Sequence, residues 1–132
     1  MSLQAHLTEL DLSDMEKLVA LPSRIGMLKG LVKLDVSVCS KLGSMPQEIG
    51  DLENLVKLDA NDTQISQPPS SIVRLNNLIF LSFEGLRLED VEMIAQLGAL
   101  QILHLTYCER LTQLQKFPKK LNTIFADWRN EN

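Results

Sequence analysis

The chain has 132 residues, 25 of them leucine, and a formal net charge of -4 at pH 7. Apolar residues recur every few positions along its whole length, which excludes an intrinsically disordered chain. With 13 basic against 17 acidic residues there is no cationic excess, so we expect no nucleic-acid partner.

A pattern L-x-x-L-x-L runs through the chain. Its copies begin at residues 7, 31, 55, 78, 100 and 121, in steps of 24, 24, 23, 22 and 21 residues, and the last copy is degraded. Steps of this length fall in the range of leucine-rich repeats, about 20–29 residues. The sequence therefore predicts an α/β leucine-rich-repeat solenoid of about six repeats, forming a single domain over residues 1–132.

Each pattern predicts one strand. Its last two apolar residues lie two positions apart and point to one face, toward the core, while the residues between them point outward. A single repeat cannot bury its apolar side alone, so successive repeats should stack and share one core. Their strands should then pair in parallel in a curved sheet, and the outward-pointing residues should lie on its concave surface. The outward positions form three columns. The first is Glu9, Lys33, Lys57, Phe80, Ile102 and Thr123; the second is Asp11, Asp35, Asp59, Ser82, His104 and Phe125; the third is Ser13, Ser37, Asn61, Glu84, Thr106 and Asp127.

The second half of each repeat should form the convex side from irregular or short helical segments. Prolines at Pro22, Pro46 and Pro68-Pro69 suit segments that lack ladder hydrogen bonds. The glycines Gly26 and Gly50 suit turns that need an unusual φ. Between residues 86 and 100, the spacing of Leu88, Val91, Ile94 and Ala95 predicts one or two turns of helix.

The two cysteines occupy equivalent positions after the strands of the second and fifth repeats. We expect Cys39 and Cys108 to be small buried residues, because three repeats at ~4.8 Å per strand separate them by more than a disulfide can span. An unpaired pair of thiols fits a reducing, intracellular compartment. Residues 1–10 contain no basic residue, so we expect no secretory signal. No apolar run approaches the roughly 18 residues of a membrane span, so we expect no membrane partner.

No motif in the chain indicates catalysis. The sequence contains no H-E-x-x-H, no G-x-S-x-G and no G-x-x-x-x-G-K-[ST]. We therefore expect no enzyme activity, no cofactor and no metal site.

An aspartate ladder, Asp11, Asp35 and Asp59, crosses the first three strands. Three interpretations are open: Lys33 and Lys57 neutralise the ladder, a basic protein partner binds it, or a divalent cation does.

The aromatic residues all lie in the second half of the chain. Phe80, Ile102, His104, Tyr107 and Phe125 should form an exposed patch, and such patches usually contact something. The contact is either a true partner or a part of a parent chain that is missing here.

Several motifs resemble the leucine-rich-repeat region of plant intracellular TIR-type nucleotide-binding immune receptors. They are L-x-x-L-x-V-x-x-C at residues 31–39, P-x-x-I-G-x-L at residues 46–52 and P-P-S-S-I at residues 68–72. The resemblance implies a protein-interaction module in disease resistance. It would recognise a pathogen effector or make autoinhibitory contacts with the nucleotide-binding part of a parent receptor. The implied location is cytoplasmic, or shared between cytoplasm and nucleus.

The chain also departs from that family. It has neither a TIR domain nor a P-loop, and its shortened repeats suggest that repeats are missing between residues 86 and 94. The alternative is a stand-alone signalling adaptor, resembling plant intracellular Ras-group repeat proteins with their L-P-x-x-I-G-x-L units. In either case the candidate partner-binding residues are Asp11, Lys33, Asp35, Lys57, Asp59, Phe80, Ser82, Ile102, His104 and Phe125.

Overall fold

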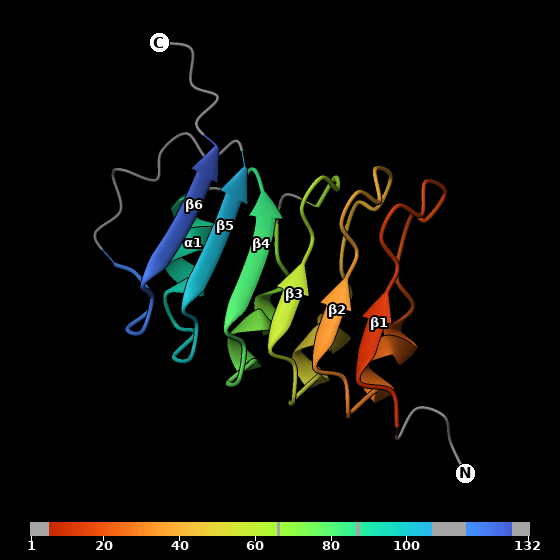
Figure 1. Cartoon of the computed structure of the whole chain (residues 1–132), viewed down its shortest axis with the longest axis horizontal. Helices are drawn as coiled ribbons and strands as arrows, with labels where there is room; N and C mark the ends of the chain where they lie inside the picture. The colour runs from red at the N-terminus through yellow and green to blue at the C-terminus, as the bar shows by residue number, and fades with distance from the viewer. Residues whose placement is uncertain (1–5, 66, 87, 107–115, 128–132) are drawn as a thin grey trace.

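A computed structural model of the chain describes residues 6–65, 67–86, 88–106 and 116–127. Six strands pair in parallel, in sequence order, in one sheet (Figure 1). They are β1 (Glu9–Asp11), β2 (Lys33–Asp35), β3 (Lys57–Asp59), β4 (Phe80–Glu84), β5 (Ile102–Thr106) and β6 (Thr123–Asp127). One strand per repeat confirms the predicted solenoid.

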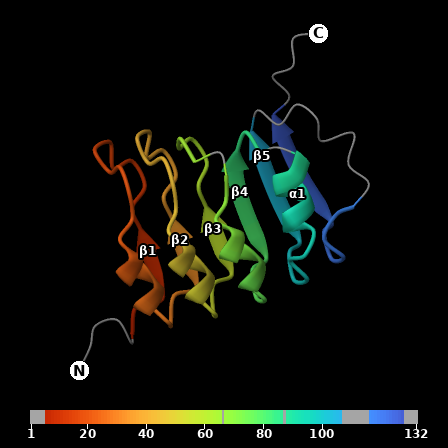
Figure 2. The same cartoon turned by 180° about the vertical axis from the view of Figure 1, so that it is seen from behind.

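Short helices line the opposite side of the sheet, as the view from behind shows (Figure 2). Three are 3₁₀ helices: η2 (Ser23–Met27), η3 (Gln47–Asp51) and η4 (Ser70–Arg74). Each begins directly after a proline in extended conformation, since proline has no N–H to contribute to a preceding turn. The fourth repeat instead has an α-helix, α1 (Leu88–Ile94), which confirms the helical spacing predicted there.

The core lies between the sheet and these helices. The inward strand positions form two rows in which no side chain is more than 1 % exposed: Leu34, Leu58, Leu81 and Leu103, and Val36, Ala60, Phe83 and Leu105. Ile49 and Ile72 close the core from the helix side, and both are fully buried. Burying one such side chain stabilises the fold by about 1.5–3 kcal/mol. The last strand differs, because Ile124 continues the first row yet is 39 % exposed.

The expectation that Gly26 and Gly50 serve turns of unusual φ is wrong. Both lie inside 3₁₀ helices, and among the described glycines the positive φ belongs to Gly85. Their role is close approach: a Cβ on Gly50 would lie 2.6 Å from the carbonyl oxygen of Ser71, and one on Gly26 would lie 2.8 Å from the Cβ of Glu48. The absence of a side chain therefore lets neighbouring 3₁₀ helices pack backbone against backbone.

A recurring left-handed residue follows the strands. Asp14, Val38, Asp62 and Gly85 occupy the same position in successive repeats, with φ of 64°, 59°, 57° and 61°. Aspartate and glycine tolerate this conformation, whereas a β-branched residue does so only under strain. Val38 is thus the exception in the row, and its side chain is 44 % exposed.

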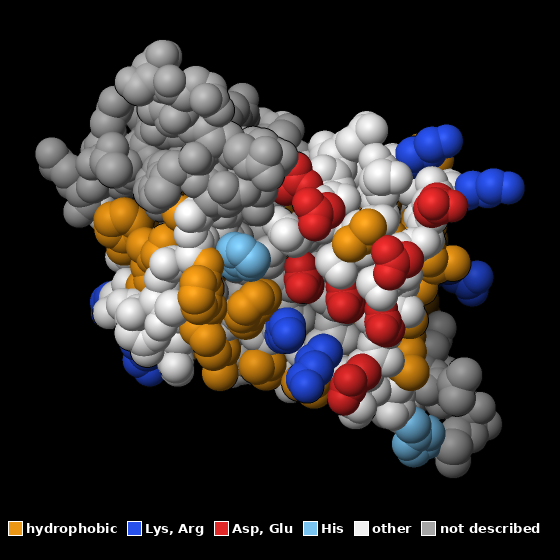
Figure 3. Space-filling view, turned by 45° about the horizontal axis from the view of Figure 1, so that its top comes forward, with side chains coloured by type: hydrophobic (Ala, Val, Ile, Leu, Met, Phe, Trp, Pro, Cys, Tyr) orange, Lys and Arg blue, Asp and Glu red, His pale blue; other side chains and the backbone are white. Residues whose placement is uncertain are grey.

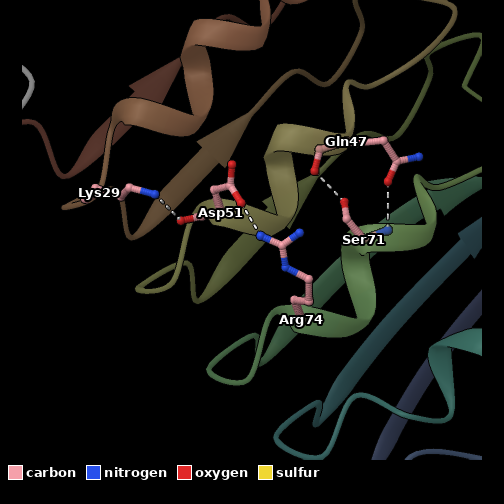
Figure 4. Close-up of polar contacts among 5 residues, drawn as sticks. All are labelled: Lys29, Gln47, Asp51, Ser71 and Arg74. Carbon is pink, nitrogen blue, oxygen red and sulfur yellow. Dashed lines mark hydrogen bonds and ion pairs between the residues drawn. The ribbon is translucent and has the colours of Figure 1, made fainter.

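Polar contacts link neighbouring helices on the back of the sheet (Figure 4). Ser71 donates its backbone N–H to Gln47 Oε1 at 3.0 Å and its hydroxyl to the Gln47 carbonyl at 2.6 Å. Arg74 forms an ion pair with Asp51, and Lys29 Nζ donates to the Asp51 carbonyl at 3.2 Å. The ion pair is largely exposed, so it contributes at most about 1 kcal/mol.

Cys39 is the buried corner residue that the sequence predicts. Its side chain is fully buried, and its thiol lies 3.0 Å from the carbonyl oxygen of Leu12 in the preceding repeat, which it can reach as a donor. Cys108 and Tyr107 lie outside the described residues.

Candidate functional site

The side of the sheet away from the helices, called here the open sheet face, carries the outward columns. Strand register aligns the first column from Glu9 to Thr123 and the second from Asp11 to Phe125, residue by residue. The structure therefore brings all the predicted site residues onto one continuous face. Their role in binding stays a prediction.

The aspartates of the second column have a local structural role that the sequence analysis missed. In each of the first three repeats, Oδ1 accepts a backbone N–H from two residues further on, at 2.9 Å, 2.9 Å and 3.1 Å. The pairs are Asp11 with Ser13, Asp35 with Ser37 and Asp59 with Asn61. The hydrogen bonds from Ser13 lower the pKa of the Asp11 carboxyl below its ordinary value. The spacings D-x-S and D-x-N were the available signal, since aspartate commonly bonds its own backbone in this way.

Acidic side chains are spread over the N-terminal half of the open sheet face (Figure 3). We define the acidic rim as Asp35, Asp59, Asp62 and Glu84. Partial burial, and then repulsion from the Asp62 carboxylate, raise the pKa of Glu84 above its ordinary value. Ionised Glu84 is therefore destabilised in the folded chain relative to its protonated form.

The lysines of the first column do not neutralise the aspartates through ion pairs. Lys57 Nζ lies 4.8 Å from the centroid of the Phe80 ring, where a cation–π contact attracts it. Within the described ranges, the ion pair that forms joins Arg74 and Asp51 on the other side of the sheet. Neutralisation of the aspartates by the nearby charges of Lys33 and Lys57, without direct ion pairs, stays a prediction.

The other half of the open sheet face is apolar and aromatic. We call Phe80, Ile102, His104 and Phe125 the aromatic shelf. The rings of His104 and Phe125 meet edge to face, with centroids 5.8 Å apart. Phe125 remains 55 % exposed, and the other three are partly exposed. Exposed apolar surface next to charged groups is typical of protein contact sites.

Ser82 lies at the junction of the two halves. Its neighbours Leu81 and Phe83 point into the core, so the alternation of a strand places Ser82 on the open sheet face, between Asp59 and His104. Expected as an exposed position, Ser82 is instead fully buried, and its hydroxyl has no hydrogen-bond partner. The sequence did not reveal this, because strand alternation predicts an exposed side chain at this position.

Neither a metal cluster nor a membrane span is present in the described part of the chain. Those residues contain no group of three or more His, Cys, Asp or Glu placed to hold a metal ion. They also contain no helix with the length and hydropathy required to cross a bilayer.

These features define a leucine-rich-repeat solenoid with one open sheet face. Solved structures of the same fold include a leucine-rich-repeat protein of Leptospira interrogans, with a TM-score of 0.54, 19 % identity and coverage of 86 % of this chain and 42 % of that one. A chain of the PEPR1–AtPEP1 complex also has a TM-score of 0.54, with 23 % identity over 77 % of this chain and 15 % of that one. No family model matches the chain.

In sequence, the chain is 40 % identical to the TMV resistance protein N of Nicotiana glutinosa over 94 % of its own length. The resemblance to the leucine-rich-repeat region of plant TIR-type nucleotide-binding resistance receptors is thereby confirmed. The chain spans 15 % of that relative. The alignment covers 176 residues and so exceeds the 132 residues of the chain by 44. At least that many positions have no counterpart here, which corresponds to about two repeats.

Proposed function

We propose that this chain is a protein-interaction module of a plant disease-resistance receptor, and that it binds its partner through the open sheet face. The observation that carries the proposal is the 40 % identity to a resistance protein over nearly the whole chain. The module acts by binding, in the cytoplasm, either a pathogen effector or the nucleotide-binding part of a receptor. Binding of the effector would serve recognition, and binding of the nucleotide-binding part would serve autoinhibition.

The shape of the face supports binding of a protein segment. Six strands at about 4.8 Å spacing make a sheet roughly 24 Å across, and strands of three to five residues add about 10–17 Å in the other direction. That is roughly 240–400 Å² in projection, below the ~800 Å² per partner of a standard interface. The face therefore suits a short segment of a partner protein better than a broad globular surface.

The test is co-precipitation from leaf cells. The tagged chain is expressed with the TIR and nucleotide-binding parts of the TMV resistance protein N, and separately with the proteins of the virus that this relative is named for. We expect one of these to co-precipitate. The double variant Phe80→Ala/Phe125→Ala should lose the partner with an unchanged circular-dichroism spectrum.

The matched control is Phe117→Ala, which removes a comparably exposed phenylalanine outside the two columns. It should retain the partner. Retention by the double variant would refute the assignment to the open sheet face, and no association with any of these proteins would refute the receptor role.

The size of the native protein distinguishes the adaptor alternative from the receptor role. An antibody to the peptide of residues 62–74 should detect a band far larger than 14.9 kDa in native tissue if the segment belongs to a receptor. A band at the mass of this chain would favour the adaptor.

A further inference from the structure

We propose that a hollow at the start of β6 binds an acidic segment of a protein partner. One apolar side chain of the segment fills the hollow, and carboxylates on either side of it reach three lysines of the chain. The hollow, called here the β6 hollow, is lined by Phe117, Leu121, Asn122, Thr123 and Ile124. Apart from Thr123, its lining lies outside the columns of the open sheet face, so the site is additional to the one proposed above.

The apolar lining of the β6 hollow is the first support. Ile124 is 39 % exposed, whereas the residues at its position in the four preceding repeats are at most 1 % exposed. Phe117 is 37 % exposed, and Leu121 is half-buried. The volume of the hollow, about 360 Å³, is at the lower end of the range of binding pockets, about 300–1,000 Å³. The hollow therefore suits one or two apolar side chains of a segment rather than a folded domain.

Positive charge around the β6 hollow is the second support. Residues 116–124 contain three lysines and no acidic residue, so the net charge of -4 divides into +3 for this segment and -7 for the rest of the chain. Lys116, Lys119 and Lys120 are all exposed. Lys116 directly precedes Phe117 and Lys120 directly precedes Leu121, which places their Cα atoms about 3.8 Å from those of the lining. This local cationic field, on a chain that is otherwise acidic, attracts an anionic ligand to the hollow.

An ordered turn positions two of the lysines. Lys119 and Lys120 occupy the turn that the Leu121 N–H closes by donating to the Pro118 carbonyl at 3.1 Å. In the part of the chain that the structure describes, the ion pair found lies on the helix side of the sheet and involves none of the three lysines. Carboxylates of a partner are the groups that complement the lysines here.

Asn122 favours a peptide over a lipid as the occupant. Its Oδ1 accepts the hydroxyl of Thr123 at 2.7 Å, which leaves its two amide N–H groups as donors. These donors suit the carbonyl oxygens of a peptide backbone. Successive residues of an extended segment are about 3.3 Å apart. Acidic residues directly beside the apolar one therefore reach the lysines that stand directly beside the lining.

The probe is an acetylated and amidated nine-residue peptide with two glutamates on each side of a leucine–phenylalanine pair and glycine and serine elsewhere. One comparison peptide has lysine in place of glutamate, and the other has serine in place of leucine and phenylalanine. Binding to the full chain is measured by isothermal titration at low salt, where charge pairs are least screened. We expect the glutamate peptide to bind and each comparison peptide to bind at least tenfold more weakly.

The net charge of the chain makes this comparison stringent. A chain of net charge -4 attracts the lysine peptide and repels the glutamate peptide if binding is non-specific. Tighter binding of the glutamate peptide therefore requires a local basic site.

The first variant, Lys119→Gln/Lys120→Gln, removes charge at exposed positions and leaves the lining intact. Affinity for the glutamate peptide should fall about three- to tenfold, given the strength of exposed charge pairs. The matched control is Lys17→Gln/Lys41→Gln, which makes the same charge change at exposed positions in the first two repeats. It should leave the affinity within twofold.

The second variant, Phe117→Ala, removes an aromatic wall of the hollow. Affinity should fall at least fivefold, since truncating an aromatic anchor is costly at binding sites, and the circular-dichroism spectrum should stay unchanged. The control Met27→Ala removes a large exposed apolar side chain on η2 and should bind as the wild type does. Because Phe117 does not lie on the open sheet face, Phe117→Ala should still retain the partner of that face.

Several results would overturn the proposal. Equal binding of the glutamate and lysine peptides would do so, as would equal binding by the wild type and Lys119→Gln/Lys120→Gln. Displacement of the glutamate peptide by vesicles of anionic phospholipid would assign the hollow to a lipid instead. A dimer in sedimentation that the lysine variant loses would assign it to a second copy of the chain. None of these results affects co-precipitation through the open sheet face, so the two proposals fail separately.

Discussion

Val38 offers the sharpest test of the backbone geometry. It is a β-branched residue with φ of 59°, in a row otherwise filled by Asp14, Asp62 and Gly85. We compare Val38→Gly with Val38→Ala, since both variants lose the same exposed methyl groups and differ in their tolerance of the left-handed conformation. The same two substitutions at Val19, an exposed residue without positive φ, serve as the control.

The magnitude follows from two opposing terms. A side chain with a Cβ pays about 1–2 kcal/mol in the left-handed region. Glycine pays about 0.5–1 kcal/mol relative to alanine, because its unfolded chain has more freedom to lose. At position 38 the difference should favour glycine by about 0.5–1 kcal/mol, or about 2–5 °C in melting temperature. At position 19 only the entropy acts, so alanine should be the more stable by about 0.5–1 kcal/mol.

The assay is urea unfolding of the four variants, followed by circular dichroism. The free energies of unfolding should reverse in order between the two positions. If Val38→Ala is as stable as Val38→Gly, the left-handed backbone at this position carries no strain, and the account of the row fails.

Three further predictions concern packing, pH and the corner thiol. Gly50→Ala should cost about 1–3 kcal/mol in unfolding free energy through overpacking, whereas Gly43→Ala, where a Cβ meets nothing within 4 Å, should cost less than about 0.5 kcal/mol in the same urea titration. The raised pKa of Glu84 means that the folded chain binds a proton at this carboxyl more tightly than the unfolded chain does, so the free energy of unfolding should increase as pH falls toward 4.5. The variant Glu84→Gln should be more stable than the wild type at pH 7 and should lose this pH dependence, as measured by thermal melts. Cys39→Ala should lower the melting temperature by several degrees, because it leaves a small cavity and removes the donor to the Leu12 carbonyl.

The repeat pattern was sufficient to predict the sheet and its surface columns. The spacing of the leucines determines which residues face outward, and equal spacing in successive repeats aligns them in register. The rows that join Asp59 to Ser82 and His104 were therefore predictable without any contact being known. The helix α1 was predictable for a similar reason, since its apolar residues recur at helical spacing.

The details that the sequence did not reveal depend on contacts between repeats. Gly50 is required by Ser71, 21 positions further along, and not by its own φ. Ser82 is fully buried, although the alternation of its strand predicts an exposed side chain. Val38 shares its backbone conformation with Asp14 and Asp62, although its residue type predicts the opposite. For Gly50 and Val38 the determining atoms belong to another repeat or to the backbone.

The sequential strand order makes the open sheet face adjustable in length. Because each strand pairs only with its neighbours in sequence, inserting or deleting a whole repeat changes two junctions and leaves the other repeats in place. One unit adds about 4.8 Å to the face. The 44 or more alignment positions without a counterpart here then amount to roughly 10 Å of reach, or about three residues of an extended ligand. Relatives that differ by whole repeats therefore differ in the width of this sheet face by whole strand spacings, while the remaining repeats keep their own geometry.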